Sequence, residues 1–377
     1  MKFYKNILIL GFLLLVGCAG YQPPKPAPLV AFKPALQLKN EWSHTVGKGT
    51  AGTYLKLTPV IANGAIFANA NGGEITAFDL QTGRKIWNVK TRLTLTTGLA
   101  AADNMLFVGT DKAQIVALKQ ADGNPGWWGK MSSEVLATPV AVGKKVIAKD
   151  ESGVLRAFST DGKLLWSYAH QEPELILRGS SSPRIFGNYV VAGFASGKLV
   201  KLNLRNGSEV WSKTIAEGRG SSDVQRMVDI DVSPKVVNGI IYVATYQGKI
   251  AAVRLKTGQI LWQHKLSSYS GLAVAKGYVY VTDDAGEVWA FDAKTGVALW
   301  RQSSLLRRDI TAPAEIGNAV VVGDTEGYLH FMAQEDGHFI GRVRITHRRI
   351  IAAPLVYRNA VYVYAADGTL AKITFQT

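Results

Sequence analysis

The stretch Asp79-Leu-Gln-Thr-Gly-Arg-Lys-Ile-Trp87 decides the fold, because its pattern of a turn glycine followed four positions later by tryptophan returns throughout the chain. A period of 38 to 51 residues separates successive turn glycines, and this predicts the blades of a β-propeller. The turn glycines are Gly83, Gly123, Gly162, Gly207, Gly258, Gly296 and Gly337. The corresponding tryptophan positions hold Trp87, Trp127, Trp166, Trp211, Trp262, Trp300 and, in the last copy, Gly341.

Each repeat divides into four short strands. Most repeats open on a proline, which is tolerated at the first residue of a strand. Asn63-Gly64 and Asn238-Gly239 then fit tight hairpin turns, because asparagine and glycine accept the positive φ that such turns require. A β-branched run such as Ile240–Thr245 follows, and the strand that ends the repeat carries the tryptophan. The repeats open at Pro59, Gly98, Pro139, Pro183, Pro234, Gly271, Pro313 and Pro354, which predicts eight blades.

The eighth repeat is one strand short, because the chain ends soon after its strand Leu370–Phe375. The segment Leu38–Val46 contains Trp42 without a turn glycine before it, as expected of a strand that enters from outside the ring. We expect it to supply the missing outer strand and close the ring without a free edge. The predicted fold class is therefore all-β: one eight-bladed β-propeller of four-stranded antiparallel blades over residues 38–377. The tryptophans are expected to pack between blades, and Gly341 predicts a looser contact between the last two.

The N-terminus predicts export. Lys2 and Lys5 precede the apolar run Ile7–Val16, which has the length of a signal-peptide core and is shorter than the roughly 20 residues of a membrane span. Residues 1–17 are therefore predicted to be a signal peptide. Leu15-Val16-Gly17-Cys18 is similar to a bacterial lipobox, which implies that Cys18 carries lipid. The alternative for Cys18 is a buried thiol, a common state of free cysteine.

Residues 18–37 are expected to tether the lipid to the folded body. The prolines of Tyr21-Gln-Pro-Pro-Lys-Pro-Ala-Pro28 favour an extended, semi-rigid chain. Ala19 follows Cys18 in place of the aspartate that resembles an inner-membrane retention signal, and this implies sorting to the outer membrane. Several acyl chains on one residue hold a protein stably at a membrane surface.

The charge of the chain limits its partners. The formal net charge is +15, and without Lys2 and Lys5 the remaining body carries +13. Such a charge attracts acidic proteins, lipid headgroups or nucleic acid, but export removes nucleic acid as a partner. The 47% of hydrophobic and 19% of charged residues exclude a disordered chain and allow a sizeable core.

No catalytic, cofactor-binding or metal-binding residue is predicted. The six histidines are scattered without the short spacing of metal ligands. Gly47-Lys-Gly-Thr-Ala-Gly52 matches a dinucleotide-binding pattern but lacks the strand before it and the helix after it. The basic clusters Arg307-Arg308 and Arg342–Arg349 are expected to be solvated loop and strand faces that favour acidic partners.

Two long connections between blades are the candidate interface. Most connections from a tryptophan to the next opening residue span 9 to 13 residues, whereas Trp166 to Pro183 spans 17 and Trp211 to Pro234 spans 23. They are consecutive and should emerge on one face as neighbours. The first contains Leu175-Ile-Leu-Arg178 and the second contains Asp229-Ile-Asp231, a composition suited to a protein interface. In the alternative, the leucines cap their own blades and the aspartates are turn residues.

The repeats resemble the tryptophan-docking repeats of quinoprotein-type propellers, over essentially the whole chain after the tether. This resemblance implies an alternative function, either as a periplasmic dehydrogenase with pyrroloquinoline quinone on the propeller axis or as another propeller binding module. Such enzymes have a calcium site, a catalytic carboxylate and, in several, adjacent cysteines, whereas Cys18 is the single cysteine of this chain. The sequence therefore favours a protein that is not an enzyme and has no cofactor.

The lipobox, the eight blades and the two connection motifs together resemble the BamB family, scaffold lipoproteins of the β-barrel assembly machinery (the BAM complex). The resemblance implies a lipid-anchored protein on the periplasmic face of the outer membrane that assists folding and insertion of outer-membrane proteins. It also implies that Leu175, Leu177, Arg178, Asp229 and Asp231 contact the periplasmic POTRA domains of BamA. Whether the propeller also binds nascent outer-membrane β-barrel proteins is left open by the sequence.

Overall fold

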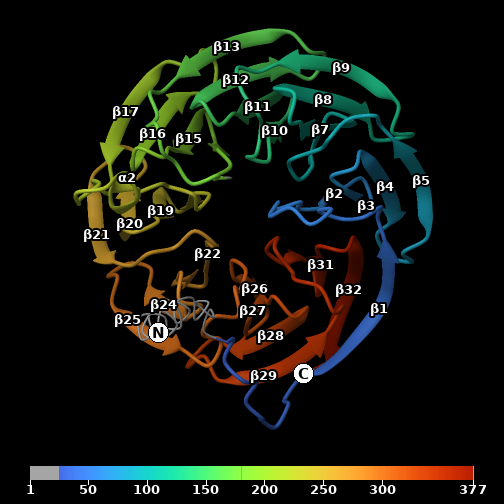
Figure 1. The fold of residues 1–377 in the computed structure, drawn as a ribbon, viewed down its shortest axis with the longest axis vertical. Helices are drawn as coiled ribbons and strands as arrows, with labels where there is room; N and C mark the ends of the chain where they lie inside the picture. Colours follow the sequence, from blue (N-terminus) through green and yellow to red (C-terminus); the bar gives the residue numbers. More distant parts are fainter. Residues whose placement is uncertain (1–24, 180, 377) are drawn as a thin grey trace, which may run out of the picture.

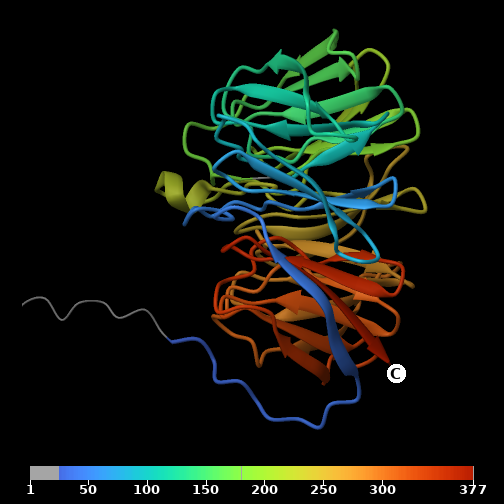
Figure 2. The ribbon, with the colours of Figure 1, turned by 90° about the vertical axis from the view of Figure 1, so that its right-hand side faces the viewer.

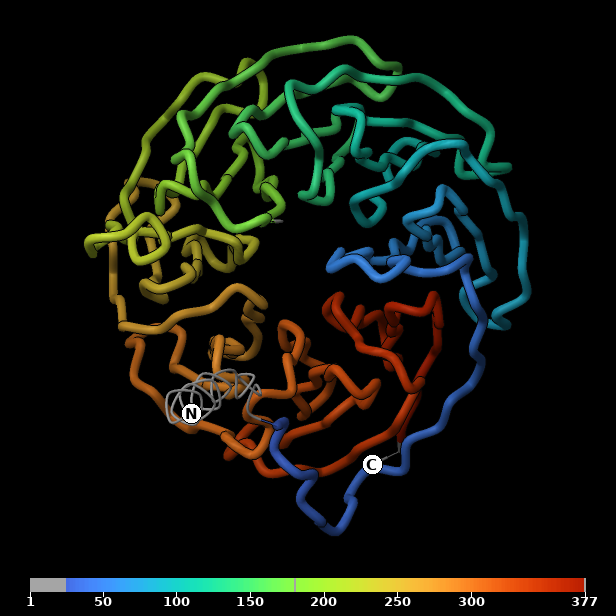
Figure 3. Tube along the Cα trace, in the orientation of Figure 1, coloured from blue at the N-terminus to red at the C-terminus, as the bar shows by residue number. Residues whose placement is uncertain are grey.

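Eight four-stranded antiparallel sheets stand around a central axis, and the chain passes once around the ring (Figure 1, Figure 3). This computed structural model describes residues 25–179 and 181–376. The predicted signal peptide, Cys18 and the first part of the tether lie outside the described residues. The predicted all-β, eight-bladed fold is confirmed.

The blades follow one another in chain order, each from its inner to its outer strand. Blade one holds β2 (Val60–Ala62), β3 (Ala65–Asn69), β4 (Glu74–Asp79) and β5 (Lys85–Lys90), and blade two holds β6 (Ala100–Ala102), β7 (Met105–Gly109), β8 (Gln114–Lys119) and β9 (Pro125–Lys130). Blade three holds β10 (Val140–Val142), β11 (Lys145–Lys149), β12 (Val154–Ser159) and β13 (Leu164–Ala169), and blade four holds β14 (Arg184–Phe186), β15 (Tyr189–Gly193), β16 (Lys198–Asn203) and β17 (Glu209–Thr214).

The second half of the ring repeats this order. Blade five holds β18 (Lys235–Val237), β19 (Ile240–Ala244), β20 (Lys249–Arg254) and β21 (Ile260–Lys265), and blade six holds β22 (Gly271–Ala275), β23 (Tyr278–Thr282), β24 (Val288–Asp292) and β25 (Ala298–Gln302). Blade seven holds β26 (Ala314–Ile316), β27 (Ala319–Gly323), β28 (Tyr328–Ala333) and β29 (Phe339–Arg344), and blade eight holds β30 (Leu355–Tyr357), β31 (Ala360–Tyr364), β32 (Thr369–Gln376) and β1 (Gln37–Thr45). Where a repeat opens on proline, the strand begins one residue after it, because proline has no N–H for the ladder.

The N-terminal strand closes the ring as predicted. β1 pairs antiparallel with β32, from Gln37 opposite Gln376 to Thr45 opposite Thr369. Blade eight thus takes its outer strand from one end of the chain and its other three strands from the opposite end. β1 therefore covers the edge that β32 would otherwise expose. No helix in the described part of the chain is long and apolar enough to span a membrane.

The tryptophans join neighbouring blades, as the repeat predicts. The Trp166 indole N–H donates to the Leu204 carbonyl in the next blade at 3.1 Å, and its ring lies on the turn glycine Gly207. A Cβ at Gly207 would lie 2.6 Å from that ring, and φ there is +73°, so only glycine fits this turn. The same indole N–H donation to the next blade is made by Trp87, Trp127, Trp211, Trp262 and Trp300.

The predicted tether is attached to the ring over residues 25–36, a segment here called the strap. Leu36 N donates to Ile340 O at 2.9 Å, which brings the strap alongside the outer strand β29 (Figure 2). The Phe32 ring lies 5.6 Å from the Phe339 ring, and the Arg342 guanidinium lies 4.9 Å from the Phe32 centroid. The described part of the predicted tether therefore packs against the ring, because the apolar side chains among its prolines can bury surface there.

The strap also changes two other expectations. A Cβ at Gly341 would lie 3.2 Å from Leu38 and 3.4 Å from Leu36, so these leucines occupy the place of the missing tryptophan and fill the predicted loose contact. Arg308, expected to be solvated, is 2% exposed. It binds Asp324 at 2.8 Å and donates to the strap carbonyl of Ala27 at 2.9 Å.

Candidate functional site: the crossings of blades three to five

The two long connections lie side by side on one face of the disc, as predicted. Ser182 N in the first connection donates to Ser233 Oγ in the second at 2.9 Å. Further along, Leu177 N donates to the Asp229 carboxylate at 2.5 Å. The second connection contains the short helix α2 (Asp223–Arg226), which stands out from this face (Figure 2). The face that carries these connections is called the crossing face below.

Local chemistry forms α2 at the tip of the second connection. Ser222 is its N-cap and accepts a hydrogen bond from Gln225 N, while the Gln225 side chain reaches back to the N-cap backbone. This capping box satisfies two donors that a helix start leaves unpaired. No residue of α2 is buried, and Val224 is 59% exposed. The sequence pattern Ser222 to Gln225 could have predicted this turn of helix.

Leu175 and Arg178 lie at the surface of the first connection. Leu175 is 43% exposed, and the Arg178 guanidinium binds Glu134 of the preceding connection at 2.6 Å. Leu177, between them, is only partly exposed. Leu177 is positioned by its own backbone, since its N–H is bound by Asp229. An apolar group and a guanidinium therefore stand together on a loop whose backbone is fixed from below.

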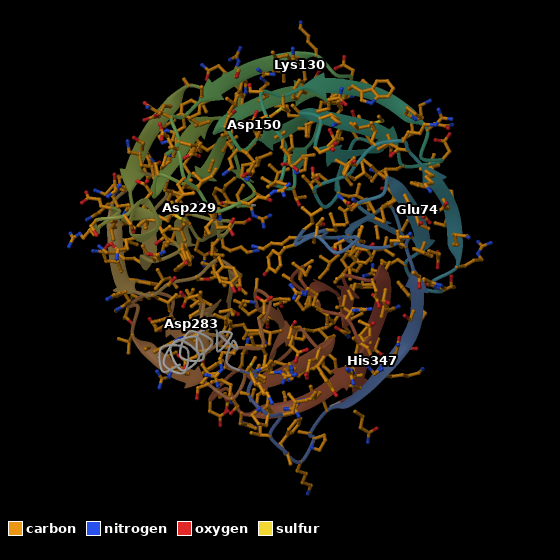
Figure 4. The ribbon with its side chains drawn as sticks, viewed as in Figure 1. Glu74, Lys130, Asp150, Asp229, Asp283 and His347 are labelled. Carbon is orange, nitrogen blue, oxygen red and sulfur yellow. The ribbon has the colours of Figure 1, made fainter. Side chains whose placement is uncertain are left out.

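Asp229 lies beneath this loop and not on the surface. It is 3% exposed, and its Oδ1 has no hydrogen-bond partner among the described residues. Burial raises the pKa of Asp229 to about 7, the bond from Leu177 N opposes that rise, and the charges of Asp231 and Glu172 add to it. Asp229 and Asp150 lie on the same side of the ring, away from Glu74 and His347 (Figure 4).

Further carboxyl groups surround Asp229. Burial raises the pKa of Glu151 to about 8, although the nearby Lys149 lowers it, and burial also raises the pKa of Glu172. Glu172 accepts a hydrogen bond from Ser196 N at 3.2 Å. The cavity among these side chains has a volume of about 20 Å³, which is room for one water molecule and not for a substrate.

Asp231 joins the connections to the far side of the channel mouth. It is 9% exposed, and the Lys56 ammonium lies 3.6 Å from its carboxylate and 2.8 Å from the Tyr269 carbonyl. Lys56 belongs to a third long connection, Trp42 to Pro59, which therefore reaches across the axis to blades five and six. A Cβ at Gly179 would lie 2.6 Å from Asp231, so the first connection passes directly over this carboxylate.

The structure thus brings together all five residues singled out on the connections, and it adds Lys56, Glu134, Glu151 and Glu172. The unusual length of the third connection could have indicated that Lys56 has a functional role. Its partner Asp231 could not have been predicted, because Asp231 lies in the connection between two other blades and nothing in the sequence around Lys56 points to it. Within the described residues no group of three histidine, cysteine or acidic side chains is arranged to hold a metal ion.

Comparison with known proteins shows which family this chain belongs to. The sequence profile described as outer membrane protein assembly factor BamB matches residues 39–97, 71–302 and 292–377. The chain belongs to the BamB family. The outer membrane protein assembly factor BamB of Pseudomonas aeruginosa is 34% identical over 377 aligned positions, 99% of each chain. The crystal structure of BamB from Moraxella catarrhalis superposes with a TM-score of 0.83 at 26% identity, over 90% of this chain and 100% of that one.

The dehydrogenase alternative is not favoured by these relatives. The quinohemoprotein alcohol dehydrogenase of Comamonas testosteroni has a TM-score of 0.70 at 15% identity, over 89% of this chain and 76% of that one, a likeness that shows the fold alone. Membership in a BamB family of assembly factors agrees with the prediction that the chain is not an enzyme. The family name also agrees with association with the outer membrane. The lipid on Cys18, the periplasmic face and the interface residues remain predictions.

Proposed function

We propose that this chain is a non-enzymatic scaffold of the outer-membrane β-barrel assembly machinery, anchored by lipid on Cys18 at the periplasmic face and bound to the POTRA domains of BamA. Its role is to assist folding and insertion of outer-membrane proteins. The observation that carries the proposal is the pairing of an exposed Leu175 and Arg178 with a buried Asp229 that fixes the loop beneath them.

The five predicted residues have two different roles in this proposal. Leu175, Leu177 and Arg178 form the contact surface, because arginine is enriched among the residues that contribute most of an interface's affinity, and the two leucines supply apolar area that excludes water around it. Asp229 and Asp231 act as positioning residues below the surface. They hold the loop in one conformation before binding, which lowers the entropy cost of ordering it in the complex.

The strap supports a lipid anchor on the same side as this surface. Its first described residue, Lys25, meets Arg307 on the crossing face, where α2 also projects (Figure 2). The seven residues 18–24 span at most about 25 Å when extended. A lipid on Cys18 would therefore keep the crossing face close to the membrane, near a partner embedded in it.

The interface is tested by titration against the soluble periplasmic part of BamA. We expect the triple variant Leu175→Ala, Leu177→Ala, Arg178→Ala to lose several kcal/mol of affinity, with single changes near ~2 kcal/mol. The control is Leu164→Ala with Arg92→Ala, which removes a leucine of similar exposure to Leu175 and an exposed arginine elsewhere. Wild-type affinity in the triple variant would refute the interface. An affinity loss matched by a lower melting temperature would mean that these residues stabilise their own blades.

The anchor is tested by Cys18→Ser. We expect this variant to fold with a wild-type melting temperature and to move from the membrane pellet to the soluble periplasmic fraction, because the lipid would be attached outside the ring. Fractionation after salt washing measures the first result and thermal melting measures the second. Retention of the variant in the pellet of cells that lack BamA would contradict the lipid anchor.

A further inference from the structure

Two basic side chains face the central channel from neighbouring blades. Arg184 is the first residue of the inner strand β14, and Lys235 is the first residue of the inner strand β18. Both line the channel cavity. The connections of the crossing face lead directly into these strands, so the two cations lie at the channel end nearest that face.

The repeat itself does not require a basic residue at this position. Arg184 lies opposite Val191 and Lys235 opposite Tyr242 in their hairpins. The residues in the same register of the other six blades are all apolar. They are Val60, Ala100, Val140, Ala273, Ala314 and Leu355. At this register the cations are therefore confined to two adjacent blades, and both line the same cavity.

The two cations have no acidic partner among the described residues. The described lining of the channel cavity contains three cations and one carboxylate, and that carboxylate, Asp231, lies 3.6 Å from the third cation, Lys56. Across residues 25–179 and 181–376 no carboxylate lies within 4.0 Å of Arg184 or Lys235, and Arg184 Nε is buried without a hydrogen-bond partner. Both side chains are partly buried, and a partly buried cation without an acidic partner costs free energy.

The surroundings of Lys235 and Arg184 also lower the pKa values of both side chains. Burial, and then the nearby charge of Arg184, lower the pKa of Lys235 to about 8. Burial likewise lowers the pKa of Arg184 from its ordinary value. Both groups are thus held in a place that disfavours their charge, and an anion between them would relieve this.

The cavity has room and donors for such an anion. Its volume is about 790 Å³, because small side chains and glycines line it. Residues with hydroxyl groups, which can donate hydrogen bonds to oxygen atoms, line it from five blades. They are Thr58, Thr138, Ser182, Ser233 and Ser270.

We propose that the channel mouth binds a phosphate-type oxyanion between Arg184 and Lys235. The planar guanidinium can bind two oxygens at once and the ammonium a third, which is the donor pattern that a phosphate group accepts. The oxyanion is either a free phosphate or the phosphate of an anionic lipid headgroup. Divalent cations are repelled by the same charges, and a purely apolar ligand would leave both cations unpaired.

The test uses the full folded chain and needs no BamA, so it is independent of the proposed function. Thermal melting and titration calorimetry are run with inorganic phosphate against chloride at equal ionic strength. We expect phosphate to raise the wild-type melting temperature by a few degrees at saturation. Arg184→Leu with Lys235→Val, which places the apolar residue types of other blades at this position, should abolish the rise and the binding heat.

The same double variant should melt above the wild type in chloride, because it removes two partly buried cations that have no acidic partner. Lys235→Met alone keeps the side-chain length and provides a second, milder variant if the double change does not fold. Lys198→Ala with Arg205→Ala removes two exposed cations of blade four and should keep the phosphate response. An equal phosphate response in the channel variants would overturn the proposal, and so would the absence of any response in the wild type to every probe.

Three probes distinguish the sources. Inorganic phosphate and glycerol phosphate test a soluble oxyanion. Flotation of the Cys18→Ser chain with vesicles that contain phosphatidylglycerol tests a headgroup, because this chain cannot bind the vesicles through a lipid on Cys18. Binding of the soluble probes that is lost in the channel variants supports a free phosphate. Vesicle binding that is lost in the same variants, without soluble binding, supports a lipid headgroup.

Discussion

A single carboxyl group, Asp229, illustrates how position changes the role of a residue. Its sequence surroundings predicted a place beside the Leu175 to Arg178 loop, and the structure places it there. Its burial could not be predicted, because that depends on the course of two connections over each other. Under the loop Asp229 accepts a backbone hydrogen bond from Leu177, while its burial there raises its pKa.

This burial predicts how Asp229→Asn changes the pH dependence of stability. A carboxyl group with a raised pKa keeps its proton in the folded state between about pH 4 and pH 7, so its contribution to stability falls as pH rises through that window. The asparagine amide cannot ionise, and its oxygen can still accept the Leu177 N–H. We expect the variant to match the wild type near pH 4.5 and to be more stable by about 3 kcal/mol at pH 8, because each pKa unit of the shift corresponds to about 1.4 kcal/mol. Denaturant unfolding across this pH range measures the difference.

The slope with pH should be reduced and not abolished, because the pKa of Glu151 and that of Glu172 are raised by burial as well. Asp223→Asn is the matched control, since it changes an exposed carboxylate in the neighbouring α2. The control should follow the wild-type profile. A wild-type slope in Asp229→Asn would mean that this carboxyl group does not carry the effect.

At the scale of elements, the strap and β29 could be predicted only in part. The tryptophan repeat located every blade, and the absence of tryptophan at Gly341 correctly marked an unusual contact. What fills that contact comes from Leu36 and Leu38, three hundred residues earlier in the chain. Periodicity describes neighbours within a repeat and carries no information about such a distant segment. The prediction that Arg308 is solvated was wrong for the same reason, because the residues that bury it include the distant strap.

The strap contact predicts a large difference between two adjacent arginines. Arg308→Ala would leave Asp324, which is 0% exposed, without its guanidinium partner, although the His330 imidazole would remain at 2.9 Å, and it would remove a hydrogen bond to the strap. Breaking a buried ion pair by removing one partner costs about 3–5 kcal/mol. We expect Arg308→Ala to lower the free energy of unfolding by about 3 kcal/mol.

Arg307→Ala is the matched control, because Arg307 is exposed and its side chain donates to the strap carbonyl of Lys25 at 3.0 Å. We expect a change of about 0.5 kcal/mol or less for this neighbour. Denaturant unfolding of both variants at one pH provides the comparison. Similar stability of the two variants would show that the Arg308 ion pairs add nothing to the fold.

For the whole molecule, ring closure was the feature that the sequence predicted best. The sequence showed that blade eight lacked its outer strand and that the segment around Trp42 belonged to no other blade. Placing this segment beside the last strand completed the blade, and β1 occupies that position. Counting strands could not predict that the third long connection crosses the channel mouth and brings Lys56 to Asp231. Closure follows from counting strands, whereas contacts across the axis depend on loop conformation.

Closure predicts that the stability of all blades depends on β1. Deleting residues 37–45 should expose the edge of β32 along its whole length and remove Trp42, whose ring lies on the turn glycine Gly83 of blade one. Blades eight and one would then separate, and each blade would lose part of the neighbour contacts that stabilise it. We expect a melting temperature lower by more than about 10 °C and a broader transition, measured by circular dichroism and calorimetry. Replacing the exposed residues 219–226 with a short glycine linker removes a similar length of chain and should change the melt little. If the two deletions melted alike and close to the wild type, β1 would be an addition to a ring that is already stable without it.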